Sequence, residues 1–328
     1  MSALKVPVSL LDRSRTRAGE DHASALWATV ERARHVEDLG HHRFWVAEHH
    51  AVPGIASGSP AVLIASVAAR TDRIRVGSGG VMLPNHRPIL VAEQFKMLQS
   101  LHPGRIDLGL GRSLGFTAPV RQALGVTRYP PEQFEQDIAA LRDFLSGNGP
   151  VTAMPASPEP PPLFVLTTGS GLEVAARAGL PVVVGGPALR EEHGGLATYR
   201  EQFRPSAQCP EPQVIISLDV MVAETTERAR ELLLPEAWAM ADSQTIGAFP
   251  PLSPVEVVRE RVPTAKQART IERTLGGAVY GTAAHVQQEL AALIESTGAA
   301  EVLASTSTYD RDDLAGADAA VAALFTAA

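Results

Sequence analysis

Short apolar runs alternate with segments of helical periodicity through the first half of the chain. The run VPVSLLD at residues 6–12 precedes residues 26–39, where apolar side chains recur every three or four positions, as on one face of a helix. Asp21 is a candidate N-cap for this helix, and Gly40 is a candidate terminator. The next apolar run, RFWVAE, is followed by a second predicted helix that begins at Pro60, because proline suits the first helical turn.

The predicted strands are apolar on both faces, which is typical of parallel strands covered by helices on both sides. Strand–helix repetition is compatible with an open doubly wound sheet or with a closed barrel, and the count of eight units favours a (β/α)8 TIM barrel. We therefore expect residues 1–328 to form one barrel domain. The predicted strands are residues 6–12, 43–48, 74–80, 105–111, 163–168, 181–186, 213–223 and 300–306.

Two segments interrupt the alternation in the second half. PASPEPPP, residues 155–162, is too rich in proline for a helix or a central strand, so we expect it on the surface. Residues 241–265, which contain GAFPPLSP, are predicted to be irregular. Helices are predicted at residues 224–240, 283–297 and 311–327.

Composition narrows the class of partner. The net charge of −7 and the pI of about 5.8 argue against a nucleic-acid or anionic-membrane surface, since both need a basic patch. The single cysteine, Cys209, rules out an internal disulfide and favours a reducing compartment. The N-terminal residues do not resemble a signal peptide, and no apolar run approaches the roughly 20 residues that span a bilayer. We expect a cytoplasmic protein that binds neither nucleic acid nor membranes.

The stretch HHRFWVAEHH places Glu48, His49 and His50 just after the second predicted strand. In a (β/α)8 barrel this is the end where loops meet substrates. His41 and His42 precede the strand, and we expect them to be exposed in a turn at the opposite end. Adjacent histidines point in opposite directions in an extended chain, and the later strand ends offer no ligand set. Proton chemistry is therefore favoured over a catalytic metal.

Two other strand ends are rich in glycine. DLGLGRSLG, residues 107–115, lacks the spacing of a dinucleotide-binding fingerprint. Its glycines are expected to let a bulky planar group approach the backbone, and Arg112 is a candidate anion partner. GSGGVMLPNHRP, residues 77–88, has consecutive glycines that indicate either close approach of a ligand or of backbone, or a β-bulge.

LTTGSGLE, residues 166–173, ends a strand and opens a helix. The hydroxyl groups of Thr167, Thr168 and Ser170, together with backbone N–H groups at a helix start, suit a phosphate. The alternative is a simple N-cap, which needs only one hydroxyl. Together the strand ends supply histidines, a carboxylate, glycine-rich segments, an arginine and a phosphate cradle. Flavin mononucleotide (FMN) needs such a set.

The segments AEHH and GSGGVMLPNHRP, within a longer stretch from Phe44 to Gly115, resemble the bacterial luciferase-like monooxygenases. The resemblance is closest to the single-subunit group 1 flavin-dependent oxidoreductases and extends over nearly the whole chain. It implies a (β/α)8 barrel that forms homodimers, with a mobile active-site loop insertion near residues 241–275. It also implies that reduced FMN is a co-substrate supplied by a separate NAD(P)H:flavin reductase. Members of the family capture O2 as a flavin C4a-hydroperoxide, which oxygenates the organic substrate.

The resemblance assigns roles to individual residues. His49 matches the active-site histidine that exchanges protons with the peroxyflavin, a role suited to a near-neutral pKa. Glu48 and His50 would orient His49 or shape the pocket. Gly79 and Gly80 match a pair that packs under the isoalloxazine ring and that luciferase joins by a non-proline cis peptide. The phosphate would be held by Arg112, Thr167, Thr168 and Ser170.

This sequence departs from the family in two places. Gly111 stands where luciferase has a reactive cysteine beside the flavin, and Leu166-Thr167-Thr168 replaces the usual GSS of the phosphate loop. Loops 112–131 and 241–275 contain aromatic residues and prolines, so we expect a hydrophobic small-molecule substrate.

The leading hypothesis is thus a flavin-dependent monooxygenase, an oxidoreductase that incorporates molecular oxygen. One alternative is an oxidoreductase on the same fold that uses the deazaflavin F420. Another is a non-catalytic flavin-binding protein, which would not need a proton-handling histidine.

Overall fold

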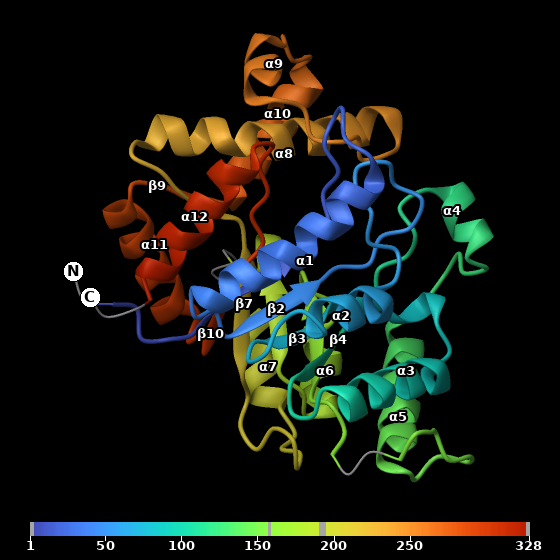
Figure 1. The fold of residues 1–328 in the computed structure, drawn as a ribbon. Coiled ribbons are helices and arrows are strands. Elements are labelled where there is room, and N and C mark those ends of the chain that lie inside the picture. Colours follow the sequence, from blue (N-terminus) through green and yellow to red (C-terminus); the bar gives the residue numbers. More distant parts are fainter. Residues whose placement is uncertain (1–2, 157–158, 190–194, 326–328) are drawn as a thin grey trace.

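The computed structural model describes residues 3–156, 159–189 and 195–325, and eight parallel strands in this part of the chain close into a barrel (Figure 1). The first strand pairs with both the second and the last, which closes the ring. The predicted (β/α)8 fold is confirmed. The barrel strands are β1 (Val8–Asp12), β2 (Arg43–Val46), β3 (Arg75–Met82), β4 (Ile106–Gly111), β5 (Leu163–Thr167), β6 (Val182–Gly185), β7 (Val214–Leu218) and β10 (Glu301–Ala304).

Helix boundaries follow the predicted capping signals. Asp21 accepts a hydrogen bond from the backbone N–H of Ser24 at the start of α1 (His22–Asp38), and Gly40 after the helix has φ +83°. Pro60 opens α2 (Pro60–Ala68). No helix among the described residues is both long and apolar enough to cross a membrane. The other helices described are α3 (Pro88–Leu101), α4 (Ala118–Ala123), α5 (Pro131–Ser146), α6 (Leu172–Ala178), α7 (Gly195–Gln202), α8 (Thr226–Ile246), α9 (Val255–Glu260), α10 (Ala265–Gly277), α11 (Ala283–Thr297), α12 (Arg311–Ala323) and the 3₁₀ helices Leu83–Asn85 and Gly186–Leu189.

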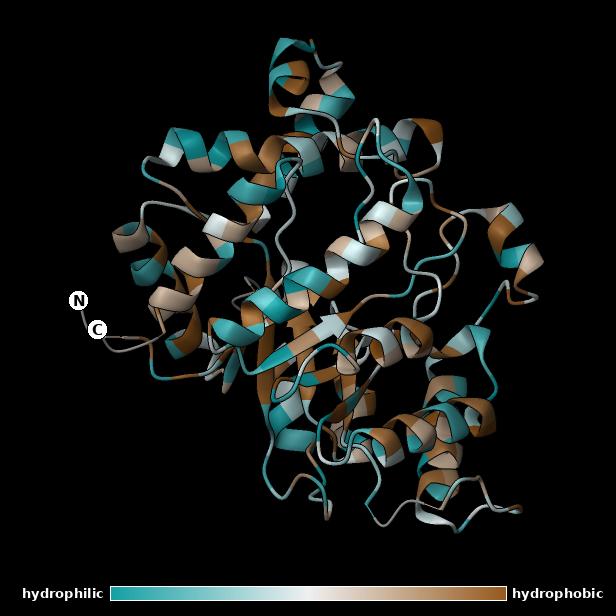
Figure 2. Ribbon diagram, viewed as in Figure 1, coloured by the Kyte–Doolittle hydropathy of each residue, from teal (hydrophilic) through white to brown (hydrophobic). Residues whose placement is uncertain are grey.

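Two apolar layers stabilise the barrel. The larger layer lies between the strands and the surrounding helices. Figure 2 shows the hydrophobic strands at the centre of the molecule. The smaller layer fills the barrel interior, where Trp45 packs edge-on against Phe164 with ring centroids 5.1 Å apart. Burying each such side chain contributes about 1.5–3 kcal/mol. The filled interior leaves ligands only the ends of the barrel.

The predicted strand at residues 213–223 is two strands. β7 ends at Leu218, and after Asp219 the chain continues as β8 (Val220–Val222), which pairs in parallel with β9 (Val279–Gly281) outside the barrel. The apolar pattern VIISLDVMV is the same on both sides of the break, because both strands are buried. Only Asp219 marks the point where the chain leaves the barrel.

Of residues 241–265, which were predicted to be irregular, 247–254 and 261–264 are non-helical as expected, whereas the others are helical, so the prediction is only partly correct. Residues 241–275, the expected loop insertion, are mostly helical. They contain the end of α8, all of α9 and most of α10, which Figure 1 shows together at the top of the view. α10 begins with a capping box between Thr264 and Gln267. The apolar faces of these helices, including Trp238 and Ile271, form a small core of their own. The prolines mark turns between short helices.

The two histidines at the start of β2 behave differently. His42 is exposed as predicted, but His41 is only 5 % exposed, and both of its ring nitrogens are buried without a hydrogen-bond partner. Burial lowers the pKa of His41 to about 4, although the carboxylate of Asp318 on α12 acts in the opposite direction. Packing of the last helix over this turn, which the local sequence does not reveal, accounts for the difference.

Candidate active site

A cavity of about 470 Å³ opens at the C-terminal end of the barrel, and its size is typical of small-molecule sites. Seven of the nine predicted site residues line it, and they come from three different strand ends, whereas Arg112 and Ser170 are not part of the lining. These seven are Glu48, His49, His50, Gly79, Gly80, Thr167 and Thr168.

Gly79 and Gly80 form part of the cavity wall on β3 and are joined by a cis peptide. A Cβ atom on Gly80 would lie 2.9 Å from the carbonyl oxygen of Gly109, and one on Gly79 would lie 2.3 Å from Cδ1 of Leu11. Both alternatives that the sequence left open apply, because neighbouring protein atoms approach the glycine pair closely and the pairing of β3 with β4 shifts register between Ser78 and Val81. Both residues nevertheless present their backbone to the cavity.

The glycines of β4 have different reasons to be glycine. A Cβ atom on Gly109 would lie 2.1 Å from the carbonyl oxygen of Ser78. Gly109 therefore permits close packing of the strands, and not the approach of a planar ligand that the sequence predicted. Gly111 lines the cavity, and the nearest atom to a Cβ there would be the carbonyl oxygen of Val81, at 3.8 Å. A side chain at position 111 would therefore project into free space.

Polar groups converge at the β4–β5 side of the cavity. Arg112 donates a hydrogen bond from Nη2 to Oγ of Ser170, at 2.7 Å. Oγ1 of Thr167 accepts the backbone N–H groups of Gly169 and Gly171, at 3.0 and 2.9 Å. The Thr167 hydroxyl thus folds the loop while keeping its own proton for donation. A guanidinium group and several hydroxyl groups are brought together here, as a phosphate requires.

His49 faces the cavity from the end of β2 with an unused ring atom. Its Nδ1 is buried and has no hydrogen-bond partner among the described residues. Burial lowers the pKa of His49 to about 4, and the positive charges of Arg13 and Arg15 act in the same direction. The carboxylates of Glu236 and Glu48 oppose this shift. The expected near-neutral pKa is therefore wrong, and the imidazole is uncharged at pH 7.

Glu48 holds two other histidines. Its Oε1 accepts hydrogen bonds from Nε2 of His50 and of His86, at 2.6 and 2.8 Å. Its Oε2 accepts the backbone N–H of Met82, at 2.8 Å. Burial opposes ionisation, but these hydrogen bonds outweigh it and lower the pKa of Glu48 to about 2. Of the two expected roles, Glu48 therefore fits shaping of the pocket better than orientation of His49.

His86 is a site residue that the sequence reasoning missed. It lies in the segment PNHRP, six residues after Gly80, and the only sequence signal was a histidine shortly after a glycine-rich strand end. Among the described residues, no group of His, Cys, Asp and Glu side chains is arranged to hold a metal ion.

A buried charged cluster on the β1 and β7 side was also missed. Glu236 of α8 accepts a hydrogen bond from Nε of Arg15, at 2.9 Å, and lies 3.2 Å from Nη1 of Arg13. Arg13 also contacts Asp219 and the carbonyl oxygen of Ser305, while its Nε is buried without a partner. The arginines follow β1 in the run RSRTR, but the acids that fix them are more than 200 residues away.

Aromatic side chains form the outer wall. The rings of Phe116 and Phe249 both line the cavity, and their centroids are 4.9 Å apart. Phe249 comes from the segment between α8 and α9, and Arg15 lies 5.8 Å from its ring centroid. Both loops that were expected to shape the pocket thus reach it.

Comparisons with known proteins agree with this geometry. Residues 6–301 match the profile of luciferase-like monooxygenases. A luciferase-like monooxygenase of Escherichia coli is 32 % identical over 322 residues, which cover 94 % of each chain. The crystal structure of apo-MsnO8 superimposes with a TM-score of 0.88 at 33 % identity and covers 98 % of each chain.

More distant structures share the fold alone. The oxygenating constituent of 3,6-diketocamphane monooxygenase, in complex with FMN, has a TM-score of 0.73 at 16 % identity and covers 97 % of each chain. An F420-dependent secondary alcohol dehydrogenase has a TM-score of 0.71 at 15 % identity, covering 99 % of this chain and 100 % of its own.

Proposed function

Because this chain belongs to the luciferase-like monooxygenase family, we propose that it uses reduced FMN and O2 to oxygenate a hydrophobic organic substrate. The observation that carries the proposal is the division of the cavity. Thr167 and Thr168 line its β5 side, and the Arg112–Ser170 pair lies in the adjoining loops. Glycine backbone forms the middle, and His49, whose buried Nδ1 has no partner among the described residues, lines the β2 side.

Each part of FMN would have a place in or beside this cavity. Arg112, Ser170 and the free hydroxyl proton of Thr167 would hold the phosphate through charge-assisted hydrogen bonds. The flat ring would lie against the exposed backbone of Gly80 and Gly111, where no side chain intervenes. Reduced FMN, when bound, supplies the electrons that activate O2.

His49 would handle the proton. With the imidazole uncharged, Nδ1 or Nε2 can accept a proton from the reacting group, and the other nitrogen can donate a hydrogen bond. Arg13 and Arg15 disfavour a positive charge on the ring and so keep it ready to act as a base. Phe116 and Phe249 would contact the apolar part of the substrate and exclude water.

Two partners follow from the same proposal. The chain carries no dinucleotide fingerprint, so a separate NAD(P)H:flavin reductase would supply reduced FMN. Large apolar side chains on the outer helices support a homodimer, since Trp27, Val62 and Leu101 are 58 %, 68 % and 67 % exposed. Light scattering should give a dimer mass for the native chain, and Val62→Glu should lower it if α2 lies in the interface.

The direct experiment follows the oxidation of reduced FMN after an anaerobic mixture with the protein is exposed to O2. We expect the protein to change the oxidation rate and FMN affinity to fall at least tenfold in Arg112→Gln. With ¹⁸O2, one labelled atom should appear in a hydrophobic substrate. An unchanged oxidation rate for the reduced flavin would contradict the proposal.

The same assay separates the alternatives. Tight binding of reduced F420 with hydride transfer in the absence of O2 would identify a deazaflavin enzyme. FMN binding without any change in flavin oxidation, in both the native chain and His49→Ala, would identify a binding protein.

A further inference from the structure

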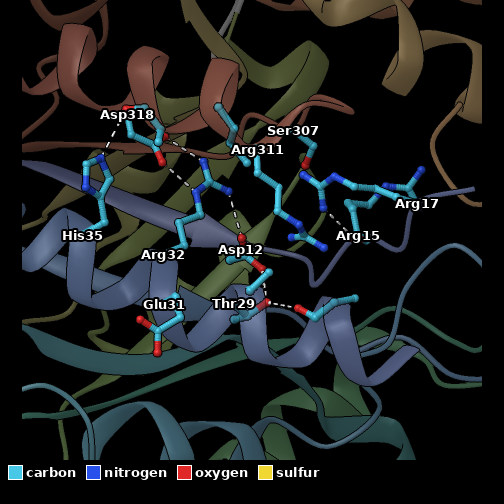
Figure 3. Close-up of a pocket in the computed structure, with 14 residues that line it drawn as sticks. Asp12, Arg15, Arg17, Thr29, Glu31, Arg32, His35, Ser307, Arg311 and Asp318 are labelled. Carbon is cyan, nitrogen blue, oxygen red and sulfur yellow. Dashed lines mark hydrogen bonds and ion pairs between the residues drawn. The ribbon is translucent and has the colours of Figure 1, made fainter. Parts of the chain in front are cut away.

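A second cavity, of about 210 Å³, lies between α1, α12 and the segments that follow β1 and β10 (Figure 3). It shares no lining residue with the cavity at the barrel mouth. Charged side chains from all of these elements line it, which is uncommon for a space between barrel helices.

The acidic side chains of this cavity are fully occupied. Arg32 donates hydrogen bonds to Asp12 from Nη1 and to Asp318 from Nε and Nη2, each at 2.8 Å. The second carboxylate oxygen of Asp12 accepts Ser14 N–H and the hydroxyl of Thr29, at 2.6 and 2.8 Å. Arg32 thus compensates both acids, and they have no need of a cationic ligand.

Arg17, at the other side of the cavity, lacks such compensation. It is only 5 % exposed, and its guanidinium group donates to the backbone carbonyls of Tyr309, Thr308 and Arg15. No carboxylate among the described residues forms an ion pair with it. The carboxylates of Glu20 and Asp12 act on Arg17 only from beyond ion-pair distance, so the buried cation is incompletely compensated and the position favours an anion.

A second cation lies beside it. Figure 3 shows the guanidinium groups of Arg17 and Arg311 next to each other, and the positive charge of Arg311 adds to burial in lowering the pKa of Arg17, to about 10. Arg311 forms an ion pair with Glu20 at the surface, where its side chain is 36 % exposed. Both arginines line the cavity, together with the buried hydroxyl of Ser307.

The other polar side chains of the lining have partners: Arg15 bonds to Glu236, Glu31 pairs with Arg34, and His35 contacts the carbonyl oxygen of Ala315. The rest of the wall consists of small or aliphatic side chains on α1 and α12, which offer no hydrogen bonds. An anion that fills this space therefore needs a short hydrocarbon part. The apolar lining residues are Ala25, Ala28, Leu314 and Ala315.

We propose that this cavity binds a small aliphatic carboxylate. Its oxygens accept hydrogen bonds from Arg17, Arg311 and Ser307, and its hydrocarbon part packs against the alanines of α1 and Leu314 of α12. The site is distinct from the barrel mouth and does not depend on the proposed flavin chemistry.

Thermal unfolding with matched probes tests the proposal. At constant ionic strength set with chloride, sodium butyrate should raise the unfolding temperature by about 1–3 °C when well above its dissociation constant. Butyramide, which has nearly the same shape without the charge, should have no effect. No shift with butyrate, or equal shifts with both compounds, would overturn the proposal.

Variants locate the site. Arg17→Met and Arg311→Gln should each weaken butyrate binding at least tenfold and leave FMN affinity within twofold of the native value. Arg311 is partly exposed, so its variant keeps the test decisive even if Arg17→Met fails to fold. Arg230→Gln, on α8 and outside the lining, and Arg112→Gln, at the barrel mouth, serve as controls that should bind butyrate normally. A butyrate effect that survives in Arg311→Gln, or disappears in Arg112→Gln, contradicts the assignment.

Discussion

Both ends of the barrel bury charged side chains, but the two ends differ in whether these side chains have hydrogen-bond and ion-pair partners within the protein. At the N-terminal end, Asp107 is fully buried and accepts hydrogen bonds from Arg43, Arg75 and the indole N–H of Trp45. Arg43 also bonds to Glu301 at the start of the last strand. Each charge of this network has a partner of opposite sign in the protein itself.

At the C-terminal end, buried polar atoms remain without partners. Nδ1 of His49 and Nε of Arg13 have none among the described residues, and glycine backbone lines the adjacent cavity. Buried polar groups in proteins are nearly always paired, so unpaired ones point to a ligand. The contrast teaches that the complete network stabilises the barrel, whereas the incomplete one is reserved for chemistry.

His49→Ala should break the active end and produce the largest effect. Loss of a positioned acid–base group costs about 10²- to 10⁴-fold in turnover. FMN affinity should stay within threefold, because the proposed phosphate site lies at the ends of β4 and β5 and not on β2. Turnover and flavin titration measure the two quantities separately. Turnover equal to that of the native chain would remove His49 from the chemistry.

Asp107→Asn should break the other end and leave the active site intact. Removing one partner of a buried charged network lowers the free energy of unfolding by about 3–5 kcal/mol, because Arg43 and Arg75 lose their shared counter-charge. Urea unfolding measures the loss, and the exposed Asp38→Asn is the matched control. Flavin affinity of the folded fraction should not change. A loss comparable to that in the control would show that the network adds little.

Lowering the pH should reduce the free energy of unfolding, because the pKa values of His49 and Glu48 at the C-terminal end are lowered in the folded chain. Between about pH 6.5 and 4 the unfolded chain protonates His49 while the folded chain does not, so stability falls as pH decreases. Glu48 acts in the same direction between its ordinary pKa of 4.5 and its lowered value of about 2. For His49, which is partly exposed, the change is on the order of 1–3 kcal/mol. Urea unfolding at several pH values should show a shallower slope above pH 4 in His49→Ala, and an identical slope would contradict the assigned pKa.

His41→Leu should have the smallest effect, and it tests whether unpaired buried polar atoms indicate a function only where they adjoin a cavity. His41 has unpartnered ring nitrogens but lies outside both cavities described above. Replacing an unsatisfied buried polar group by an apolar one is near neutral or stabilising, so the free energy of unfolding should change by less than about 1 kcal/mol or increase. Turnover should be unchanged. A marked loss of turnover would mean that unpaired atoms far from the mouth also serve the reaction.

Much of the barrel was predictable because its signals are local. Strands buried on both faces, Asp21 as an N-cap and proline at the first turn of α2 each depend on a few neighbouring residues. The break after β7 was not predictable, because β7 and β8 are equally apolar and differ only in which strand they pair with. α9 was missed because it has only six residues and lies between Pro254 and Pro263, whereas α10 was missed although its capping box is a local signal.

In the candidate site, too, residues with local sequence signals were predicted, and those that depend on distant contacts were not. Residues at strand ends, such as His49 and Thr167, were found because the (β/α)8 fold brings strand ends together. Glu236 was missed because its role depends on a contact between α8 and a segment more than 200 residues earlier. The pKa of His49 was mispredicted for the same reason, since burial and the distant arginines determine it.

The departure of the chain from the barrel at Asp219 has an evolutionary consequence. β7 is hydrogen-bonded directly to β10, so the ring closes without any contribution from β8, β9 or the helices between them. The excursion has its own apolar core and delivers Phe249 to the mouth of the cavity. Insertions, deletions or exchange of this module between relatives would leave strand register untouched. Descendants could thus diversify in the molecules they accept while inheriting the same flavin cradle.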